Sequence, residues 1–114
     1  MKGKTMRFVE ASTFTKRLVR LVDDESYREL QNELAENPEK GKLIQRTGGL
    51  RKVRMAARGK GKSGGARVIY LYLAMHGVIY MVYVYDKGEA EDLTPAQKQE
   101  LKAIAEAIKK EYRR

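Results

Sequence analysis

The residues best suited to chemistry are cations gathered in one central stretch of the chain. Between Gly48 and Arg67 the sequence carries seven basic residues and no acidic one, and no Asp or Glu occurs between Glu39 and Asp86. The whole chain has 24 Lys and Arg against 15 Asp and Glu, a net charge of +9. Because the excess lies inside the chain rather than in a terminal tail, it predicts a folded surface for a polyanion, most commonly nucleic acid.

Two of these cations alternate with apolar residues, which is the pattern of a strand. In the stretch LRKVRMA, Lys52 and Arg54 would share one face and the apolar side chains the other. Arg67 opens the next β-prone run, and Tyr85 and Lys87 close a third. If these three strands pair in order, the cations and the phenol converge on a site about one phosphate wide.

Such a cluster suits cleavage of RNA without a metal or a histidine. The 2′-hydroxyl attacks the adjacent phosphorus, and fixed Arg and Lys side chains stabilise the negative charge that develops on the phosphoryl oxygens. Arg stays protonated, so Lys52 is the candidate base, because neighbouring positive charges favour its neutral amine. From the residues alone, plain binding of nucleic acid is the simpler interpretation and RNA cleavage the more specific one.

Other chemistries lack the residues they require. The sequence has no cysteine and one histidine, His76, in a predicted turn, and its acidic residues have no ligand-like spacing. We therefore expect no disulfide, no metal site and no histidine-pair nuclease. The triplet Gly61-Lys62-Ser63 invites comparison with a phosphate-binding loop, but Ala56 stands where that motif needs Gly, and a strand follows. We expect no cofactor.

Helices are predicted on either side of the strands in the sequence. A β-prone run over Met6–Val9 predicts a first strand, and caps at Ser12 or Thr13 and at Asp24 predict two helices in an antiparallel hairpin. Asn37-Pro38 ends the second helix, because a residue before proline avoids helical angles.

A connector over Gly41–Gly49 leads into the sheet, and Leu43 and Ile44 are expected to anchor it to the core. Strands are then predicted over Leu50–Ala56, Ala66–Leu73 and Val78–Tyr85. The last two are apolar on both faces, as strands are when both sides are covered or one side faces a partner.

A last helix begins at Thr94, where Thr94 and Gln97 form a capping box around Pro95. Its buried stripe is expected to comprise Leu101, Ile104, Ala105, Ile108 and Tyr112. The sequence thus predicts a single α+β domain over residues 1–114, with an antiparallel-centred sheet of about four strands and the helices packed on one face.

No apolar run approaches the ~20 residues that span a bilayer. The N-terminus, MKGKTMRFVE, lacks the apolar core of a signal peptide. We expect a cytoplasmic protein without a membrane partner.

Several of these motifs resemble those of the RelE superfamily of toxins. The resemblance rests on RTGGLRKVR, from Arg46 to Arg54, and on RGKGKSGGARVIYL, from Arg58 to Leu71. The loop GKGKSGGAR is similar to the HigB-type branch in particular. Tyr85-Asp86-Lys87, with Glu89 and Asp92-Leu93-Thr94, resembles the end of the same pattern.

The resemblance implies a toxin of a type II toxin–antitoxin pair and an endoribonuclease. Such toxins enter the ribosomal A site and cleave mRNA there without a metal, leaving a 2′,3′-cyclic phosphate. The implied partners are the ribosome, mRNA and a cognate antitoxin. In HigB-type systems the antitoxin usually carries a helix-turn-helix, so DNA would be bound only through it. The implied fold is a small antiparallel-centred sheet with helices against one face.

By position, Lys52 and Arg54 fall where such toxins have two strand cations, and Arg67 falls where they have an arginine that contacts the scissile phosphate. Our leading hypothesis is that Lys52 is the base and that Arg54 and Arg67 bind the scissile phosphate. Tyr85 would stack on or orient a nucleobase, and Lys87 would donate a proton to the leaving oxygen. Binding of ribosomal RNA or the mRNA backbone falls to Arg51, Arg58, Lys60 and Lys62. Arg54 stands where some members have lysine and Lys87 roughly where others have arginine, so the individual acid and base roles stay open.

Two alternatives remain at this point. A ParE-like relative on the same fold would inhibit DNA gyrase without catalysis, although such an inhibitor does not need convergent cations. A plain RNA-binding or ribosome-binding module would tolerate exchange of Lys and Arg throughout the basic stretch, whereas an active site would not.

Overall fold

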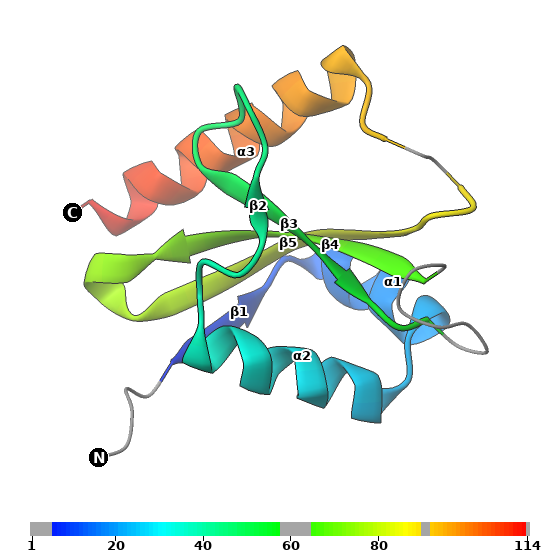
Figure 1. The fold of residues 1–114 in the computed structure, drawn as a ribbon. Helices are drawn as coiled ribbons and strands as arrows, with labels where there is room; N and C mark the ends of the chain where they lie inside the picture. Colours follow the sequence, from blue (N-terminus) through cyan, green and yellow to red (C-terminus); the bar gives the residue numbers. More distant parts are fainter. Residues whose placement is uncertain (1–5, 58–64, 90–91, 114) are drawn as a thin grey trace.

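One five-stranded sheet forms the centre of the protein. The structure, a computed structural model, describes residues 6–57, 65–89 and 92–113, and none of the helices in these ranges is long and apolar enough to cross a membrane. The strands are ordered β1-β5-β4-β3-β2 (Figure 1). The elements in chain order are β1 (Arg7–Glu10), α1 (Ser12–Leu21), α2 (Asp24–Glu36), β2 (Lys42–Leu43), β3 (Leu50–Met55), β4 (Ala66–Leu73), the 3-10 helix η1 (Ala74–His76), β5 (Val78–Asp86) and α3 (Pro95–Tyr112).

The sheet is antiparallel at its centre and parallel at one edge. Strands β2 to β5 pair antiparallel in succession, and β1 pairs parallel with β5. The α+β class and the meander of β3, β4 and β5 are therefore confirmed. Strand β1 adds a parallel edge. Between β1 and β5 the chain passes through α1, α2 and three further strands.

The fifth strand, β2, lies in the segment expected to be a connector. Its two residues pair antiparallel with β3, with Lys42 opposite Lys52 and Leu43 opposite Arg51. Two residues are too few to show a strand period in a sequence. Leu43 is 58% exposed, so the expectation that it anchors the connector is wrong, whereas Ile44 packs against the core.

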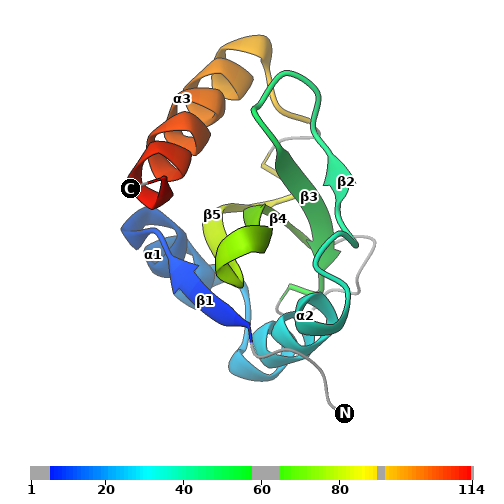
Figure 2. The ribbon, with the colours of Figure 1, turned by 90° about the vertical axis from the view of Figure 1, so that its left-hand side faces the viewer.

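The helices cover both faces of the sheet, and the expectation that they share one face is wrong (Figures 1 and 2). The first core lies between the sheet and α1 and α2, and includes Phe14, Leu30, Leu34, Val53, Val68 and Met81. The second lies under α3, and includes Leu50, Ile69, Leu71, Leu101, Ala105 and Ile108. Covering on both sides explains why β4 and β5 carry apolar side chains on both faces.

Two helix starts differ from prediction. Helix α1 follows Ala11 without a side-chain cap, and the expected caps Ser12 and Thr13 lie at or near its start within the helix. Helix α2 is capped by Asp23 rather than Asp24, since the Asp23 carboxylate accepts a hydrogen bond of 2.8 Å from a first-turn backbone N–H. A cap is chosen by its extended backbone as well as its side chain, and the sequence shows only the side chain.

Other boundaries are confirmed. Helix α2 ends at Glu36, directly before Asn37-Pro38, and Thr94 and Gln97 form the capping box of α3. The predicted buried stripe of α3 is confirmed at Leu101, Ala105 and Ile108, while Tyr112 is partly buried and Ile104 is 43% exposed.

A β-bulge in β5 decides which side chains share a face. The register shifts opposite Ile69 and Tyr70, so that Ile69 pairs with Tyr83 and Tyr70 with Met81. The skipped residue, Val82, and its neighbour Tyr83 both pack in the core under α3. One extra residue reverses the facing of everything beyond it. The bulge therefore sets the facing of the end of β5 relative to its start.

Tyr70 joins three segments at the edge of the first core. Its hydroxyl donates to the Pro38 carbonyl at 2.7 Å and accepts from the Gly41 N–H at 2.9 Å. We expect Tyr70→Phe to lower the free energy of unfolding by about 1–3 kcal/mol at neutral pH, because the buried Gly41 N–H and the partly buried Pro38 carbonyl lose their hydrogen bond. Urea unfolding measures this, and Tyr72→Phe, at a partly exposed position, is the control.

The difference in stability between wild type and Tyr70→Phe also depends on pH. Burial raises the pKa of Tyr70 above its ordinary value of 10.0, so the phenolate prefers the unfolded chain. The stability that Tyr70 contributes is present below pH 10 and is lost as the pH rises towards the folded-state pKa. The difference between wild type and Tyr70→Phe should therefore shrink above pH 10. A constant difference would contradict this assignment.

Candidate active site

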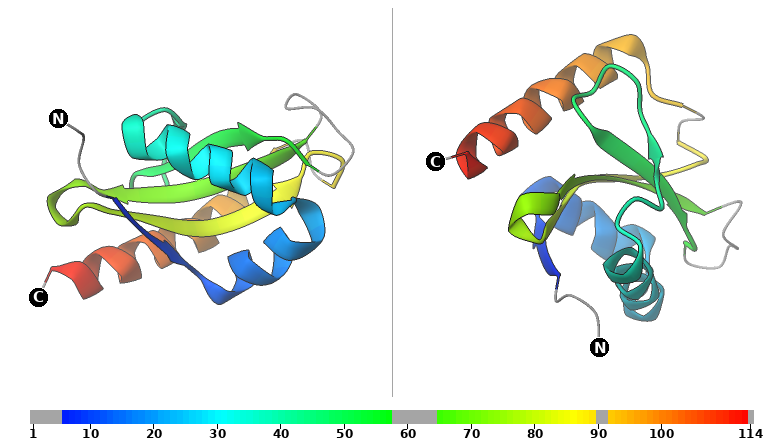
Figure 3. Two further views of the ribbon diagram at one scale, coloured as in Figure 1. Left: turned by 90° about the horizontal axis from the view of Figure 1, so that it is seen from below. Right: turned by 60° about the vertical axis from the view of Figure 1, so that its left-hand side comes forward.

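The strand register gathers most of the predicted site residues in one place. Arg54, Arg67 and Tyr85 stand directly opposite one another on β3, β4 and β5. Directly paired residues point to the same face of a sheet, and here it is the face that α3 covers. The next row holds Lys52 opposite Ile69. These strand ends lie together at the end of the sheet away from η1 (Figure 3, left).

The cations in this row differ greatly in burial. Arg54 is exposed and Lys52 is half-buried, while Arg67 is only 8% exposed. A guanidinium so enclosed between two strands keeps its charge, because Arg cannot be deprotonated in proteins. Arg67 is therefore a fixed positive charge in the middle of the row, with Arg54 beside it in contact with solvent.

Tyr85 is a buried phenol beside that charge. Its hydroxyl oxygen has no hydrogen-bond partner among the described residues. Burial is the main cause that raises the pKa of Tyr85, the Asp92 carboxylate raises it further, and Arg67 opposes both. The neutral phenol is thus a hydrogen-bond donor whose oxygen is buried and has no acceptor among the described residues. At 3% exposure, its ring is not accessible for stacking on a nucleobase in this conformation.

Asp92 is a site member that the sequence analysis did not single out. Its carboxylate lies 3.3 Å from Lys52 Nζ and also accepts a 2.8 Å hydrogen bond from the Leu93 N–H. The hydrogen bond from Leu93 and then Lys52 lower the pKa of Asp92. In this conformation the Lys52 ammonium is therefore engaged by the Asp92 carboxylate. Asp92 had appeared only as part of the family-like pattern Asp92-Leu93-Thr94.

The remaining predicted residues lie apart from the row. Lys87 is exposed in the turn after β5, where its backbone N–H donates to the Gly65 carbonyl at 3.0 Å. Arg51 belongs to the other face of β3, and its guanidinium donates to the carbonyls of Glu39 and Gly41. That contact fixes the connector and does not place Arg51 with the other cations. Arg58, Lys60 and Lys62 lie outside the described residues.

The residues needed to bind a metal do not gather here. Within residues 6–57, 65–89 and 92–113, no three His, Asp or Glu side chains are grouped so as to hold a metal ion. The site as described is a set of cations, one phenol and one carboxylate. It can bind a phosphodiester, stabilise added negative charge on it and exchange protons.

Asp92→Asn isolates the role of the carboxylate, because asparagine keeps an oxygen for the Leu93 N–H but loses the charge. We expect the pKa of Tyr85 to fall, since Asp92 raises it. Affinity for a 2′-O-methyl RNA oligonucleotide should rise about two- to five-fold at low salt, the size expected for an exposed ion pair. Tyrosine ultraviolet titration and fluorescence anisotropy measure the two effects.

Glu36→Gln is the matched control, because it removes the same charge from the exposed end of α2. Equal gains in affinity from Asp92→Asn and Glu36→Gln would mean that only net charge matters and that Asp92 does not compete for the site.

Comparison with known proteins identifies the family to which the chain is similar. A family model described as the RelE toxin of the RelE / RelB toxin-antitoxin system matches residues 6–113. Among solved structures, the chain is similar to a double arginine-to-alanine mutant of E. coli toxin RelE in the free state. That match has a TM-score of 0.56 at 14% identity, and covers 77% of this chain and 90% of the other.

Two toxin–antitoxin complexes are also similar. The intact E. coli RelBE complex matches with a TM-score of 0.57 at 17% identity, over 72% of this chain and 96% of that chain. The archaeal RelE-RelB complex from Pyrococcus horikoshii matches with a TM-score of 0.50 at 25% identity, over 76% of this chain and all of that chain. The two E. coli proteins are 14% and 17% identical to this chain, so their similarity shows a shared fold and nothing further.

Proposed function

Because the chain belongs to the family of RelE toxins of RelE/RelB toxin–antitoxin systems, we propose that it is an endoribonuclease that cleaves mRNA in the ribosomal A site without a metal. The observation that carries the proposal is the row of Arg54, Arg67 and Tyr85 across three strands, with Lys52 in the next row. This row is the place in the described structure where several cations meet a proton-bearing group.

The proposed reaction assigns one role to each group. Lys52, released from Asp92, takes the proton of the 2′-hydroxyl, and the 2′-oxygen bonds to phosphorus. Arg54 and Arg67 bind the phosphoryl oxygens as charge develops, and the Tyr85 hydroxyl donates a hydrogen bond to one of them. The bond from phosphorus to the 5′-oxygen breaks, and Lys87 protonates that oxygen. The products are a 2′,3′-cyclic phosphate and a free 5′-hydroxyl.

The burial of Arg67 favours catalysis over plain binding. A surface that only attracts phosphates needs exposed, solvated cations, and enclosing a guanidinium costs desolvation free energy. An enclosed charge is instead preorganised, so it stabilises a transition state without rearranging solvent. This supports the nuclease over the RNA-binding module.

Further proposals follow from the resemblance in the sequence. We propose that the chain is of the HigB type, on the strength of the loop GKGKSGGAR, most of which lies outside the described residues. Its partner would then be an antitoxin with a helix-turn-helix, through which the pair binds DNA. The ribosome and mRNA would be its targets in the cytoplasm.

Two substitutions test the phosphate-binding roles. Arg54→Ala removes an exposed side chain, and Arg67→Lys keeps most of the buried volume but loses the planar fork that binds two oxygens. Each should lower the single-turnover rate on mRNA-programmed ribosomes about 100- to 1,000-fold, as loss of one such donor does. Thermal melting should stay close to wild type for Arg54→Ala.

The control is Arg20→Ala, which removes an exposed arginine of α1. If Arg67→Lys cleaves at the wild-type rate, charge alone is needed and the bidentate role is wrong. We prefer Arg67→Lys to Arg67→Ala, because truncating a buried side chain leaves a cavity and impairs folding.

Expression in bacteria tests the function itself. The 5′ ends of a reporter mRNA would be mapped by primer extension, with and without its start codon. We expect in-frame cuts that occur only when the message is translated. Cuts on the untranslated message would indicate a free ribonuclease. Growth arrest without cuts would indicate a gyrase-type inhibitor instead.

A further inference from the structure

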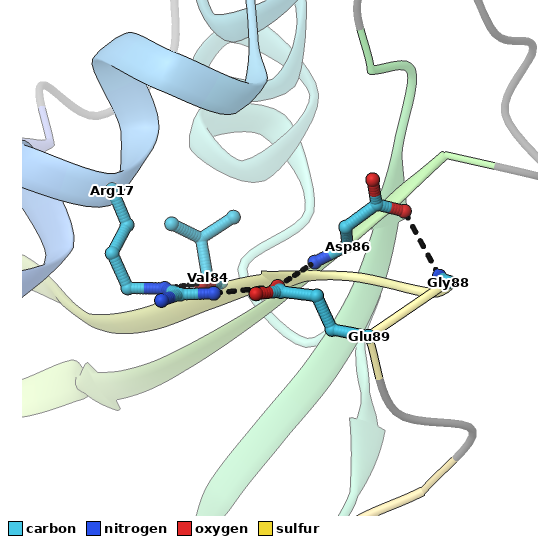
Figure 4. Close-up of polar contacts among 5 residues, drawn as sticks. All are labelled: Arg17, Val84, Asp86, Gly88 and Glu89. Carbon is cyan, nitrogen blue, oxygen red and sulfur yellow. Dashed lines mark hydrogen bonds and ion pairs between the residues drawn. The ribbon is translucent and has the colours of Figure 1, made fainter.

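A second arginine centre lies beside the candidate active site. Arg17 reaches from α1 to the end of β5, where its Nε donates to the Val84 carbonyl at 2.6 Å and its Nη2 contacts Glu89 Oε1 at 2.6 Å (Figure 4). The same guanidinium lies 5.0 Å from the centre of the Tyr83 ring. Its side chain is only 18% exposed. None of the roles proposed above uses Arg17.

The Arg17 side chain lies along the part of the β5 edge that β1 does not pair with. Strand β1 pairs with β5 only as far as Met81, where the Ala11 N–H makes the last backbone contact. Beyond that point the outer edge of β5 has no partner strand in the described structure. The Arg17 side chain supplies the donor for Val84 there, and it protects the part of β5 that ends in Tyr85.

The turn after β5 is held by the ion pair with Arg17. Glu89 Oε1, which contacts Arg17, also accepts from the Asp86 N–H at 2.9 Å (Figure 4). The Asp86 carboxylate accepts from the Gly88 N–H at 2.9 Å, and the Asp86 carbonyl accepts from the Glu89 N–H. On the other side, the Lys87 N–H donates to the carbonyl of Gly65, directly before β4. The turn that carries Lys87 is thus fixed from two directions.

Arg17 also connects to the aromatic part of the site. The Tyr83 ring that it covers lies 6.1 Å from the Tyr85 ring, between centroids, at an interplanar angle of 30°. Tyr85 in turn stands directly opposite Arg67. A continuous set of contacts therefore leads from α1 through Tyr83 and Tyr85 to the central cation of the row.

We propose that Arg17 is a positioning residue of the active site, which holds the turn 86–89 with Lys87 and the Tyr83–Tyr85 pair in place beside Arg67. The assignment rests on the proposed nuclease function for its kinetic consequence and on geometry for its structural one. Arg17 would not touch RNA. An ordinary ion pair with a half-exposed glutamate would contribute little, but Arg17 joins a backbone carbonyl, a carboxylate and a ring at once.

Amide hydrogen exchange tests the structural part in the whole protein. In R17A, the amide of Asp86 should exchange at least about ten-fold faster than in wild type, because its Glu89 acceptor is no longer held. The amides of Val68 and Ile69 in β4 should be unchanged. R20A, in the same helix, should leave Asp86 unchanged as well. An Asp86 amide equally protected in wild type and R17A would overturn the proposal.

Single-turnover cleavage on programmed ribosomes tests the kinetic part. R17A should lower the maximal cleavage rate about 100-fold, which is the cost of a small misplacement of catalytic groups. The ribosome concentration that gives half of the maximal rate should change by less than about two-fold. R17K keeps a cation for Glu89 and Tyr83, so its maximal cleavage rate should lie within about ten-fold of the wild-type rate. A higher ribosome concentration at half of the maximal rate, with the maximal rate unchanged, would make Arg17 an RNA-binding residue and overturn the positioning role. An R17A rate equal to wild type would also overturn it.

The two proposals fail separately. If wild-type protein makes no cut, the nuclease proposal is wrong, and the exchange of the Asp86 amide still decides whether Arg17 holds the turn. If wild type cuts and R17A cuts equally well, the nuclease stands and the positioning role is wrong. E89Q, which keeps an oxygen for the Asp86 N–H but loses the charge, should fall between wild type and R17A in both measurements.

Discussion

The pairing register of β3, β4 and β5 is the constraint on which the site depends. Hydrogen bonds between these strands place Arg54, Arg67 and Tyr85 in one row, although Arg54 and Tyr85 are far apart in the sequence. The bulge near Val82 sets the facing of the end of β5 within this register. A slip of one residue in any of the three strands would send its site residue to the opposite face, under α1 and α2.

Charge and burial are combined unusually in this row. Like charges on neighbouring strands repel, so Arg54 and Arg67 are stable side by side only if an anion or solvent compensates them. In the described structure Asp92 supplies negative charge nearby through its pair with Lys52. The same carboxylate raises the pKa of Tyr85, so one exposed residue influences both proton-bearing groups of the site. An RNA phosphate would bring the same sign of charge to the same cations.

The two cores have different parts in supporting this arrangement. The core under α3 holds the face on which the row lies, while α1 and α2 fill the other face. Helix α1 also reaches around the edge of β5 through Arg17 and contacts the turn that follows it. The open edge of β5 is thereby stabilised by a side chain where the parallel strand β1 ends. A site on strand ends needs such support, because strand ends are where a sheet frays most easily.

The sequence by itself determined whatever depends on near neighbours in the chain. Four features are local patterns of this kind: the acid-free basic stretch, the alternation of Lys52 and Arg54 with core residues, the end of α2 before Pro38 and the capping box at Thr94. The last three are present in the structure. The family motifs belong to this class too, because they are short and contiguous.

Only the tertiary structure decided what depends on contacts between distant residues. It placed α3 on the face opposite α1 and α2, joined the Arg51 guanidinium to the carbonyls of Glu39 and Gly41, and buried Arg67 within the row. It also brought Asp92 to Lys52 and Arg17 to Glu89. Residue type and local spacing set which face of its own strand a side chain takes. Which strands, turns and helices then meet on that face follows from pairing register and packing, and no local pattern contains these.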